Sequence, residues 1–177
     1  WYCVGCEAFR TPRELEEGRC PIHPTLDVER VAESNWFFRL SAHQQFLAEF
    51  LRANPGFVRP ASRYNEILAF VERGLEDVSI TRASTDWGIP FPLAAGDGRH
   101  QAIYVWFDAL INYISAVGLG TDDALLAKWW PADLHVIGKD ITRFHSVIWP
   151  AMLMSAGVAL PRQVFGHGWV HLKGEKM

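Results

Sequence analysis

Two groups of residues in this sequence have the types and the spacing that chemistry requires. Near the amino terminus, Cys3 and Cys6 form a C-x-x-C pair, and Cys20 and His23 form a C-x-x-H pair after thirteen intervening residues. In the second half of the chain, the tripeptide Gly-Lys-Asp at 138–140 directly follows a short apolar run. The first group predicts a metal site, and the second predicts a site for a phosphate- or ribose-bearing ligand.

The cysteine and histidine pairs are typical of a structural zinc site. Each two-residue spacing lets two soft ligands converge on one ion, and a tetrahedral site with four protein ligands leaves no position for a reacting water. We expect Cys3, Cys6, Cys20 and His23 to bind Zn²⁺ and to hold together a segment too small for its own core. The alternative is a reduced surface hairpin with incidental cysteines. The odd number of cysteines, three in all, argues against a disulfide framework and favours a reducing cytoplasm.

The Gly-Lys-Asp tripeptide lies between a strand pattern and a helix pattern. Leu134, Val136 and Ile137 form an apolar run short enough for a buried parallel strand, and apolar residues then recur at helical spacing over 141–149. Thr142 is expected to cap that helix. Ligands in open α/β sheets collect at the carboxyl ends of strands, so a turn with Asp140, followed by His145 one turn into the helix, suits a nucleotide. The alternative is an ordinary strand–helix connection.

Strand and helix patterns alternate on both sides of this turn. From about residue 75 the order is strand, helix, strand, helix, strand, which is typical of a parallel sheet with crossover helices. The expected helices lie at 41–53, 62–73 and 107–117, and the expected strands lie at 77–82, 102–105, 134–137 and 163–172. The pattern predicts an α/β fold that accounts for half of a doubly wound domain.

Composition narrows the class of protein. Hydrophobic residues make up 49% of the 177 and aromatic residues 13%, which is enough for a core, and the formal net charge is −3. That charge argues against nucleic-acid binding through bulk positive charge. The sequence shows no apolar run near the roughly 18 residues of a membrane span and no signal-peptide pattern. Because the chain starts at Trp1 and ends at Met177 after a lysine, we expect both ends to be internal to a longer protein.

Several stretches, in order along the chain, resemble the methionyl-tRNA synthetases, a family of class I aminoacyl-tRNA synthetases. They are SITR at 79–82, YVWFDALINY at 104–113, HVIGKDITRFHSVIWPAML at 135–153, HGWV at 167–170 and the terminal Lys176-Met177, which resembles the start of the family's Lys-Met-Ser-Lys-Ser loop. The cysteine segment is similar to the zinc knuckle of the family's connective insertion. Each motif alone is modest, but together they are specific and span essentially the whole chain.

The resemblance implies a domain layout. Residues 1–75 would belong to the connective insertion, with the zinc knuckle at 1–25. Residues 76–177 would form the second half of the split Rossmann-like catalytic domain and end at the start of the Lys-Met-Ser-Lys-Ser loop. The first half of the nucleotide fold, with its His-Ile-Gly-His signature, and the anticodon-binding helical domain would lie outside the chain. We therefore expect the isolated chain to be inactive.

The resemblance also implies a methionine pocket. Its lining residues would be Trp106, Ala109, Leu110, Tyr113, Ile141 and His145. Aromatic rings hold a polarizable thioether well, Trp106 and Tyr113 lie two helical turns apart on one face, and either His145 or the Tyr113 hydroxyl would lie near the sulfur. The family often has a proline at the position of Leu110, which we expect to alter the shape of the pocket and not its specificity. Without the resemblance, core packing is the simpler interpretation of Trp106 and Tyr113.

For ATP, the resemblance implies contacts at two strand ends. Gly138 and Asp140 would meet the ribose, and the backbone at His167, Gly168 and Val170 would contact adenine, where glycine permits close approach.

Two basic residues would act in catalysis. Arg82 corresponds to a family arginine beside the reacting carboxylate and phosphate, although a surface ion pair is the alternative, and Lys176 begins the signature loop. Three other histidines, namely His100, His135 and His171, are treated as ordinary core or surface residues.

The implied activity is that of a methionine–tRNA ligase in the cytoplasm. Such an enzyme activates methionine with ATP and magnesium to methionyl-adenylate and transfers the methionyl group to tRNA(Met). Two alternatives stay open. One is a non-catalytic zinc-knuckle module that binds RNA or protein, and the other is a class I synthetase for leucine, isoleucine, valine or cysteine.

Overall fold

The computed structural model describes residues 1–6, 8–83, 85, 87–94, 98–173 and 175–176. These residues form two compact units, and each unit is assembled from two separate stretches of the chain. The first unit contains Trp1–Phe37 and Ser79–Tyr104, and the second contains Phe38–Val78 and Val105–Met177.

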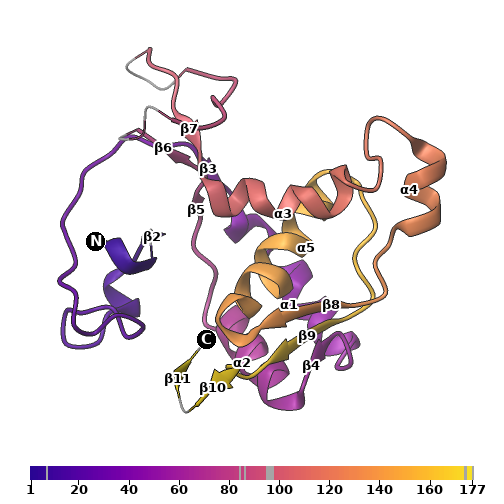
Figure 1. The fold of residues 1–177 in the computed structure, drawn as a ribbon, viewed down its shortest axis with the longest axis horizontal. Coiled ribbons are helices and arrows are strands. Elements are labelled where there is room, and N and C mark those ends of the chain that lie inside the picture. The colour runs from indigo at the N-terminus through magenta and orange to yellow at the C-terminus, as the bar shows by residue number, and fades with distance from the viewer. Residues whose placement is uncertain (7, 84, 86, 95–97, 174, 177) are drawn as a thin grey trace. The chain divides into compact units, whose positions relative to one another are not determined.

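A parallel sheet forms the centre of the second unit. Its strands are β4 (Val58–Arg59), β8 (His135–Gly138) and β9 (Val164–His167), in the order β4-β9-β8 (Figure 1). Because the strands are parallel, their carboxyl ends meet at one edge of the sheet, and Gly138 lies opposite His167 there. The predicted α/β class with a parallel sheet is confirmed.

Helices make up most of the second unit outside the sheet. They are α1 (Gln44–Ala53), α2 (Ala61–Glu72), α3 (Val105–Ser115), α4 (Asp123–Trp129) and α5 (Trp149–Ser155), with a 3-10 turn at Leu40–His43 before α1. The helices predicted from apolar periodicity correspond to α1, α2 and α3, because each buries one face and exposes the other.

The segment between β8 and α5 is not a regular α-helix. A 3-10 turn spans Lys139–Ile141, and a π-helical turn spans Phe144–Ile148. Thr142 does not cap a helix as expected, and its hydroxyl donates to the Lys139 carbonyl at 2.8 Å. The reason is that the backbone of Thr142 is already helical, whereas a capping residue needs an extended one. Single π-helical turns are rare and occur frequently at functional sites.

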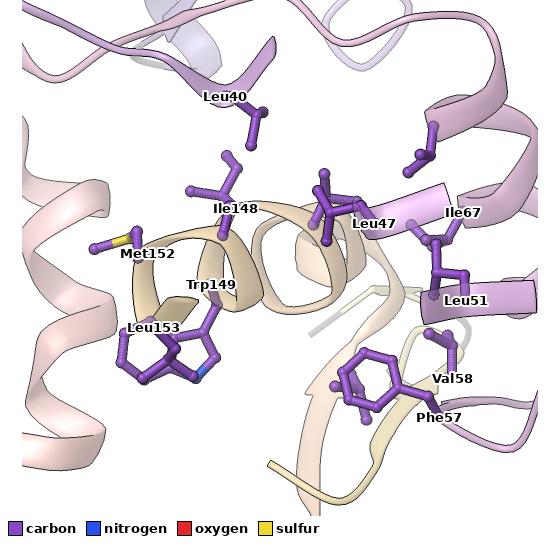
Figure 2. Packing of buried hydrophobic residues seen from close by; sticks show 14 of the residues in the cluster. Leu40, Leu47, Leu51, Phe57, Val58, Ile67, Ile148, Trp149, Met152 and Leu153 are labelled. Atoms are coloured by element: carbon purple, nitrogen blue, oxygen red, sulfur yellow. The ribbon is translucent and has the colours of Figure 1, made fainter. Parts of the chain in front are cut away.

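The hydrophobic core of the second unit draws on α1, α2, α5 and the sheet (Figure 2). Leu47 and Leu51 on α1 and Ile67 on α2 are 0% exposed, and Trp149 and Leu153 on α5 are 1% exposed. A spacing of four residues puts each pair on one face of its helix. Full burial stabilises by about 1.5–3 kcal/mol for each such side chain, so this cluster fixes α5 and the turn that precedes it.

Short strands and turns dominate the first unit. β1 (Tyr2–Cys3) pairs with β2 (Ala8–Phe9), and β6 (Thr81–Arg82) pairs with β7 (Ala102–Ile103), both antiparallel. The 3-10 turns of this unit span Val4–Cys6 and Pro12–Glu14. The strand predicted at 102–105 is present in shortened form as β7.

Two further strand pairs differ from the sequence prediction. β3 (Phe37–Phe38) pairs with β5 (Val78–Ser79), so the strand expected over 77–82 is divided between β5 and β6. β10 (His171–Leu172) pairs antiparallel with β11 (Glu175–Lys176). The continuous strand expected over 163–172 is therefore wrong, because its last residues pair with β11 instead of continuing in the parallel sheet.

The compact units divide the chain differently from the domain boundary expected near residue 75. Residues 38–75 belong to the second unit, and β4 within them is a strand of the parallel sheet. Compactness does not reveal which segment is an insertion. The division into 1–75 and 76–177, with a knuckle at 1–25, stays a prediction.

Candidate active site and metal site

The structure brings the four predicted zinc ligands together in the first unit. The Cys3 Sγ lies 3.7 Å from the His23 Nδ1. The Cys6 Sγ lies 3.2 Å from the same nitrogen and 3.5 Å from the Cys20 Sγ. All four donor atoms lie within 4.8 Å of one another. Ligands arranged tetrahedrally around one Zn²⁺ lie roughly 3.3–3.8 Å apart, so this donor set fits that ion.

The local backbone explains why these side chains converge. Cys3 ends β1, Cys6 ends the following 3-10 turn, and an isolated antiparallel bridge joins Cys20 to His23. A Cβ at Gly5 would lie 2.7 Å from the His23 ring, so glycine is required for this close approach. Cys3 and Cys20 are 0% exposed. The site is therefore built into the fold of the segment.

An arginine brings positive charge to this cluster. The Arg10 Nη2 donates to the Cys6 Sγ at 2.9 Å. Burial raises the pKa of the Cys6 thiol to about 11, although Arg10 acts in the opposite direction. Burial also raises the pKa of Cys20, but hydrogen bonds from the backbone of Ile22 and His23 and from the side chains of Cys6 and Cys3 together lower this pKa to about 6. The sequence pattern does not identify Arg10, because no spacing rule relates an arginine to the cysteine ligand that it contacts.

In the second unit, three predicted pocket residues form one hydrogen-bonded group. The Tyr113 hydroxyl on α3 lies 3.0 Å from the His145 Nε2 in the π-helical turn. The His145 Nδ1 lies 3.1 Å from the Ile141 carbonyl oxygen, four residues earlier. The turn after β8 is thereby joined to α3.

These hydrogen bonds define the state of His145. A carbonyl oxygen only accepts, so the His145 Nδ1 carries a hydrogen and donates it to Ile141. Burial lowers the pKa of His145, against the opposing effect of this backbone bond, and the side chain is 4% exposed. The neutral ring leaves Nε2 as an acceptor, so the Tyr113 hydroxyl donates to it. The hydroxyl hydrogen of Tyr113 is therefore engaged by His145.

His145 and Tyr113 belong to a larger aromatic group. The Tyr113 ring centroid lies 4.5 Å from that of His135 and 6.1 Å from that of Trp149. The Trp149 Nε1 donates to the His135 Nε2 at 3.3 Å, and the Trp130 ring lies 6.2 Å from His135 and 6.1 Å from Trp149. From the sequence, His135 was expected to be an ordinary core or surface histidine, and its contacts with these rings were not predicted. Only the fold brings these rings, which come from separate elements, into contact.

His135 is expected to make the stability of the second unit depend on pH. Burial, together with the nearby His145, lowers the pKa of His135 from 6.5 to about 4. Between these values the unfolded state binds the extra proton, so stability is fully present above about pH 6.5 and declines as the pH falls towards about 4. The thermal midpoint should therefore fall between about pH 7 and about pH 5, and His135→Gln should weaken that dependence. An equal pH dependence of the thermal midpoint in His135→Gln and wild type would contradict this role of His135. His171→Gln, on exposed β10, is the control and should behave like wild type.

The Gly-Lys-Asp turn and the residues after β9 meet at the same edge of the sheet. The Trp169 Nε1 donates to the Asp140 Oδ2 at 2.6 Å, and the Lys139 Nζ lies 3.7 Å from the centroid of the Trp169 ring. The His167 Nδ1 donates to the Gly168 carbonyl at 2.6 Å. The two sets of residues predicted for ATP are thus neighbours. The family resemblance assigned no role to Trp169, although it lies within the HGWV motif.

Two glycines at this edge are not required by the surrounding structure. Gly138 has φ −68° and ψ 146°, which any residue adopts, and a Cβ at Gly138 or Gly168 would meet no described heavy atom within 4 Å. A Cβ at Gly166, by contrast, would lie 2.9 Å from the Thr142 Oγ1. Packing therefore accounts for Gly166, whereas Gly138 and Gly168 leave open space through which a ligand can approach the backbone.

The other predicted pocket residues differ in exposure. Leu110 is 3% exposed and packs in the hydrophobic core. Trp106 and Ile141 are 49% and 42% exposed, and Ala109 is half-buried. Trp106 and Ile141 therefore offer surface to a ligand, whereas Leu110 supports α3 from the core.

Arg82 lies in the first unit and is 9% exposed, so the alternative of a surface ion pair is wrong. Its guanidinium carbon lies 3.8 Å from the centroid of the Tyr104 ring. Its Nη1 donates to the Ser79 Oγ at 3.0 Å and to the Thr81 carbonyl at 2.8 Å. Burial raises the pKa of Tyr104 to about 12, although Arg82 acts in the opposite direction. The role of Arg82 in catalysis stays a prediction.

The last predicted residues lie near the end of the described chain. Val170 is 55% exposed. Only the backbone of Lys176 is described, as part of β11 opposite His171, and Met177 lies outside the described residues. The role of Lys176 as the start of a signature loop stays a prediction.

An open cavity of about 340 Å³ also lies in the second unit. It is lined by Tyr113, Val117, Trp129, Trp130, Ala132, Leu134, His135 and Val136. Among the residues predicted to bind methionine or ATP, only Tyr113 borders it. The candidate substrate site is therefore defined by the hydrogen-bonded group and the turn, and not by this cavity.

A parallel sheet with open space at two glycines, Gly138 and Gly168, at its carboxyl edge is typical of α/β nucleotide-binding folds. The family model described as tRNA synthetases class I (M) matches residues 2–177. The chain belongs to this family.

Several curated relatives are similar over the whole chain. The methionine–tRNA ligase of Nostoc sp. is 53% identical, with 100% of this chain and 34% of the relative covered. That of Thermotoga maritima is 51% identical, with 100% of this chain and 28% of the relative covered. The chain thus spans about a third of the length of these relatives.

A solved structure is similar as well. The Mycobacterium tuberculosis methionyl-tRNA synthetase in complex with methionyl-adenylate has a TM-score of 0.86 and 46% sequence identity, with 100% of this chain and 35% of that chain covered. Among the described residues of the present chain, no helix is both long enough and apolar enough to cross a membrane.

Proposed function

We propose that this chain is the part of a methionine–tRNA ligase that holds methionine and ATP next to each other. The observation that carries the proposal is the hydrogen-bonded group of Tyr113, His145 and Ile141. Ile141 and His145 directly follow the turn that contains Gly138 and Asp140, and Tyr113 joins them from α3. One short segment therefore supplies residues for both substrates.

The methionine side of the site is neutral and aromatic. Trp106, Tyr113 and His145 would surround the thioether, whose sulfur interacts favourably with aromatic rings. Because the Tyr113 hydroxyl donates to His145, both groups are satisfied and neither is charged. Such a pocket suits an apolar side chain, since a charged one would lose its hydration without a partner. Ala109 and Ile141 would complete the lining, with Leu110 behind them.

The ATP side lies at the carboxyl edge of the sheet. The Asp140 carboxylate would accept hydrogen bonds from the ribose hydroxyls next to Gly138. The backbone at His167, Gly168 and Val170 would contact adenine. The open space at Gly138 and Gly168 supports this assignment, as does the pairing of Gly138 with His167 across the strands.

The proposed reaction has two steps. An oxygen of the methionine carboxylate attacks the α-phosphorus of ATP, the bond to the bridging oxygen breaks, and pyrophosphate leaves. A hydroxyl of the terminal adenosine of tRNA(Met) then attacks the carbonyl carbon of methionyl-adenylate, and AMP leaves. Positioning and charge stabilisation do most of this work. Mg²⁺ bound to ATP supplies part of the charge, and Arg82 and Lys176 are the proposed cations of the protein.

Zn²⁺ at Cys3, Cys6, Cys20 and His23 would hold the connective insertion together. The distances between the donor atoms, the closed set of four ligands and the burial of Cys3 and Cys20 support a structural ion. Thiolate ligands and tRNA charging both fit a reducing cytoplasm.

Arg10 is expected to tighten zinc binding. Three thiolates and a neutral imidazole leave a Zn²⁺ site with excess negative charge, which the guanidinium at Cys6 offsets. Arg10→Ala should lower the zinc affinity about 10- to 100-fold, the usual effect of losing the partner of a metal ligand. Competition with a chromophoric chelator measures it, and Arg13→Ala, an exposed neighbour, should bind zinc like wild type. An unchanged affinity in Arg10→Ala would refute the role.

A non-catalytic zinc-knuckle module is the main alternative. It accounts for the cysteine cluster but not for the open glycines or for the bonded pair of Tyr113 and His145. The family match also extends far beyond the knuckle, over residues 2–177. A synthetase for leucine, isoleucine, valine or cysteine is the second alternative, and the names of the similar ligases favour methionine over it.

Exchange of labelled pyrophosphate into ATP tests the proposal. Methionine should drive exchange by the full-length protein. The isolated 177-residue chain should show none, because it spans about a third of the length of its relatives. Absence of exchange in the full-length protein would contradict the proposed function, whereas exchange by the isolated chain would contradict only its predicted inactivity.

A further inference from the structure

We propose that Trp169 is a positioning residue that orients Asp140 for the ribose of ATP and keeps Lys139 away from that carboxylate. The inference rests on the proposed ATP site and adds a residue to it. Trp169 follows β9, whereas its two partners follow β8. The parallel register places Gly138 opposite His167, so both segments leave the sheet at the same edge.

Two different parts of one indole contact two consecutive residues of the turn. The Nε1 hydrogen reaches the Asp140 Oδ2 at 2.6 Å, and the ring face lies 3.7 Å from the Lys139 Nζ. The first contact is a hydrogen bond to a charged group, and the second is a cation–π interaction. Together they set the direction of both side chains.

The hydrogen bond is compatible with a ligand on the same carboxylate. A carboxylate has about four acceptor positions on its two oxygens, so an indole at Oδ2 and ribose hydroxyls can share Asp140. Asp140 is itself exposed, and the bond from Trp169 restricts the rotamers that its side chain adopts. An ordered carboxylate binds a ribose with a smaller loss of entropy.

The cation–π contact prevents a competing ion pair. Lys139 is the neighbour of Asp140, and its ammonium group would otherwise be available to pair with the carboxylate that the ribose needs. With Trp169 beneath it, the ammonium group lies over the ring. Trp169 is 45% exposed, so its contribution to the hydrophobic core is small and its replacement should leave the fold intact.

A double-mutant cycle in the full-length protein tests the inference, with Trp169→Phe, Asp140→Ala and both together. Trp169→Phe should raise the KM for ATP about tenfold, the size of one hydrogen bond to a charged group, and should leave the KM for methionine within about twofold of wild type. In the Asp140→Ala background it should have no further effect, because Trp169 acts through that carboxylate. Trp129→Phe is the matched control, because the Trp129 ring also contacts a lysine, the Lys128 Nζ lying 5.0 Å from its centroid. This substitution should leave the KM for ATP unchanged.

Parallel assays with 2′,3′-dideoxy-ATP separate the ribose role of Asp140 from the positioning role of Trp169. Wild type should prefer ATP, and Trp169→Phe should lose most of that preference. No preference in wild type would overturn the ribose role of Asp140 in the proposed function. Three results would overturn the role of Trp169 but leave the ribose role of Asp140 intact. They are a preference for ATP that Trp169→Phe retains, additive effects of the two substitutions in the cycle, and an equal rise in the KM for methionine. Should Trp169→Phe melt at a lower temperature, Trp169→Tyr, which also lacks the indole N–H, should show the same rise for ATP.

Discussion

Replacing Cys20 and His23 together with alanine should abolish zinc binding by this protein. The change removes two of the four donors that lie within 4.8 Å of one another, and a structural ion needs all four. The zinc content measured by atomic emission should fall from about one ion per chain to background. His171→Ala, a histidine on exposed β10, should retain the metal. Stoichiometric zinc in the double variant would contradict the metal site.

The same replacement should unfold the first unit. Among the described residues of that unit, the buried apolar side chains are Cys3, Cys20, Ala102 and Tyr104, and two of these four are zinc ligands. Binding of structural zinc contributes about 10–16 kcal/mol in small zinc domains, which so small a core cannot replace. Hydrogen exchange should show loss of protection over β1 and β2, while α1, α2 and α5 stay protected, because the large core lies in the second unit.

The second large effect is expected at His145. His145→Ala in the full-length protein should lower kcat/KM for methionine about 10- to 100-fold, because it leaves the Tyr113 hydroxyl without its acceptor and opens a cavity beside it. The KM for ATP should change much less. Tyr113→Phe should cost less than His145→Ala, since the ring stays in place. The assay is methionine-dependent pyrophosphate exchange.

A matched histidine provides the control for that prediction. His100 also bonds a backbone carbonyl through Nδ1, that of Phe91 at 3.0 Å, but it is exposed. His100→Ala should therefore leave kcat/KM for methionine unchanged. Equal kcat/KM in His145→Ala and wild type would contradict the proposed methionine pocket. Because Tyr113 and His145 share one hydrogen bond, their effects should be less than additive in the double variant.

Local patterns were enough to predict the metal site and the main elements. The spacing of Cys3, Cys6, Cys20 and His23 identified four donors that the structure brings together. Apolar periodicity predicted α1 and α2, and the apolar run before Gly138 predicted β8. Each of these features depends on residues close in sequence, or on a spacing that the chemistry of one ion requires.

Features that depend on distant contacts were not predicted. β4 has two residues and exists because it pairs with β9, more than one hundred positions later. The role of His135 depends on Trp149 and Tyr113, which only the packing of α3 and α5 against β8 brings near it. Arg10 and Trp169 likewise contact side chains that motifs identify. No spacing rule identifies Arg10, and the HGWV motif assigned no role to Trp169.

The choice of amino acid by the full-length protein tests the central claim most directly. The claim is that the neutral aromatic group around Tyr113 and His145 binds methionine. In pyrophosphate exchange, we predict that kcat/KM for methionine exceeds that for leucine by about 100-fold or more, the range that one apolar pocket can achieve. A kcat/KM for leucine equal to or above that for methionine would contradict the account.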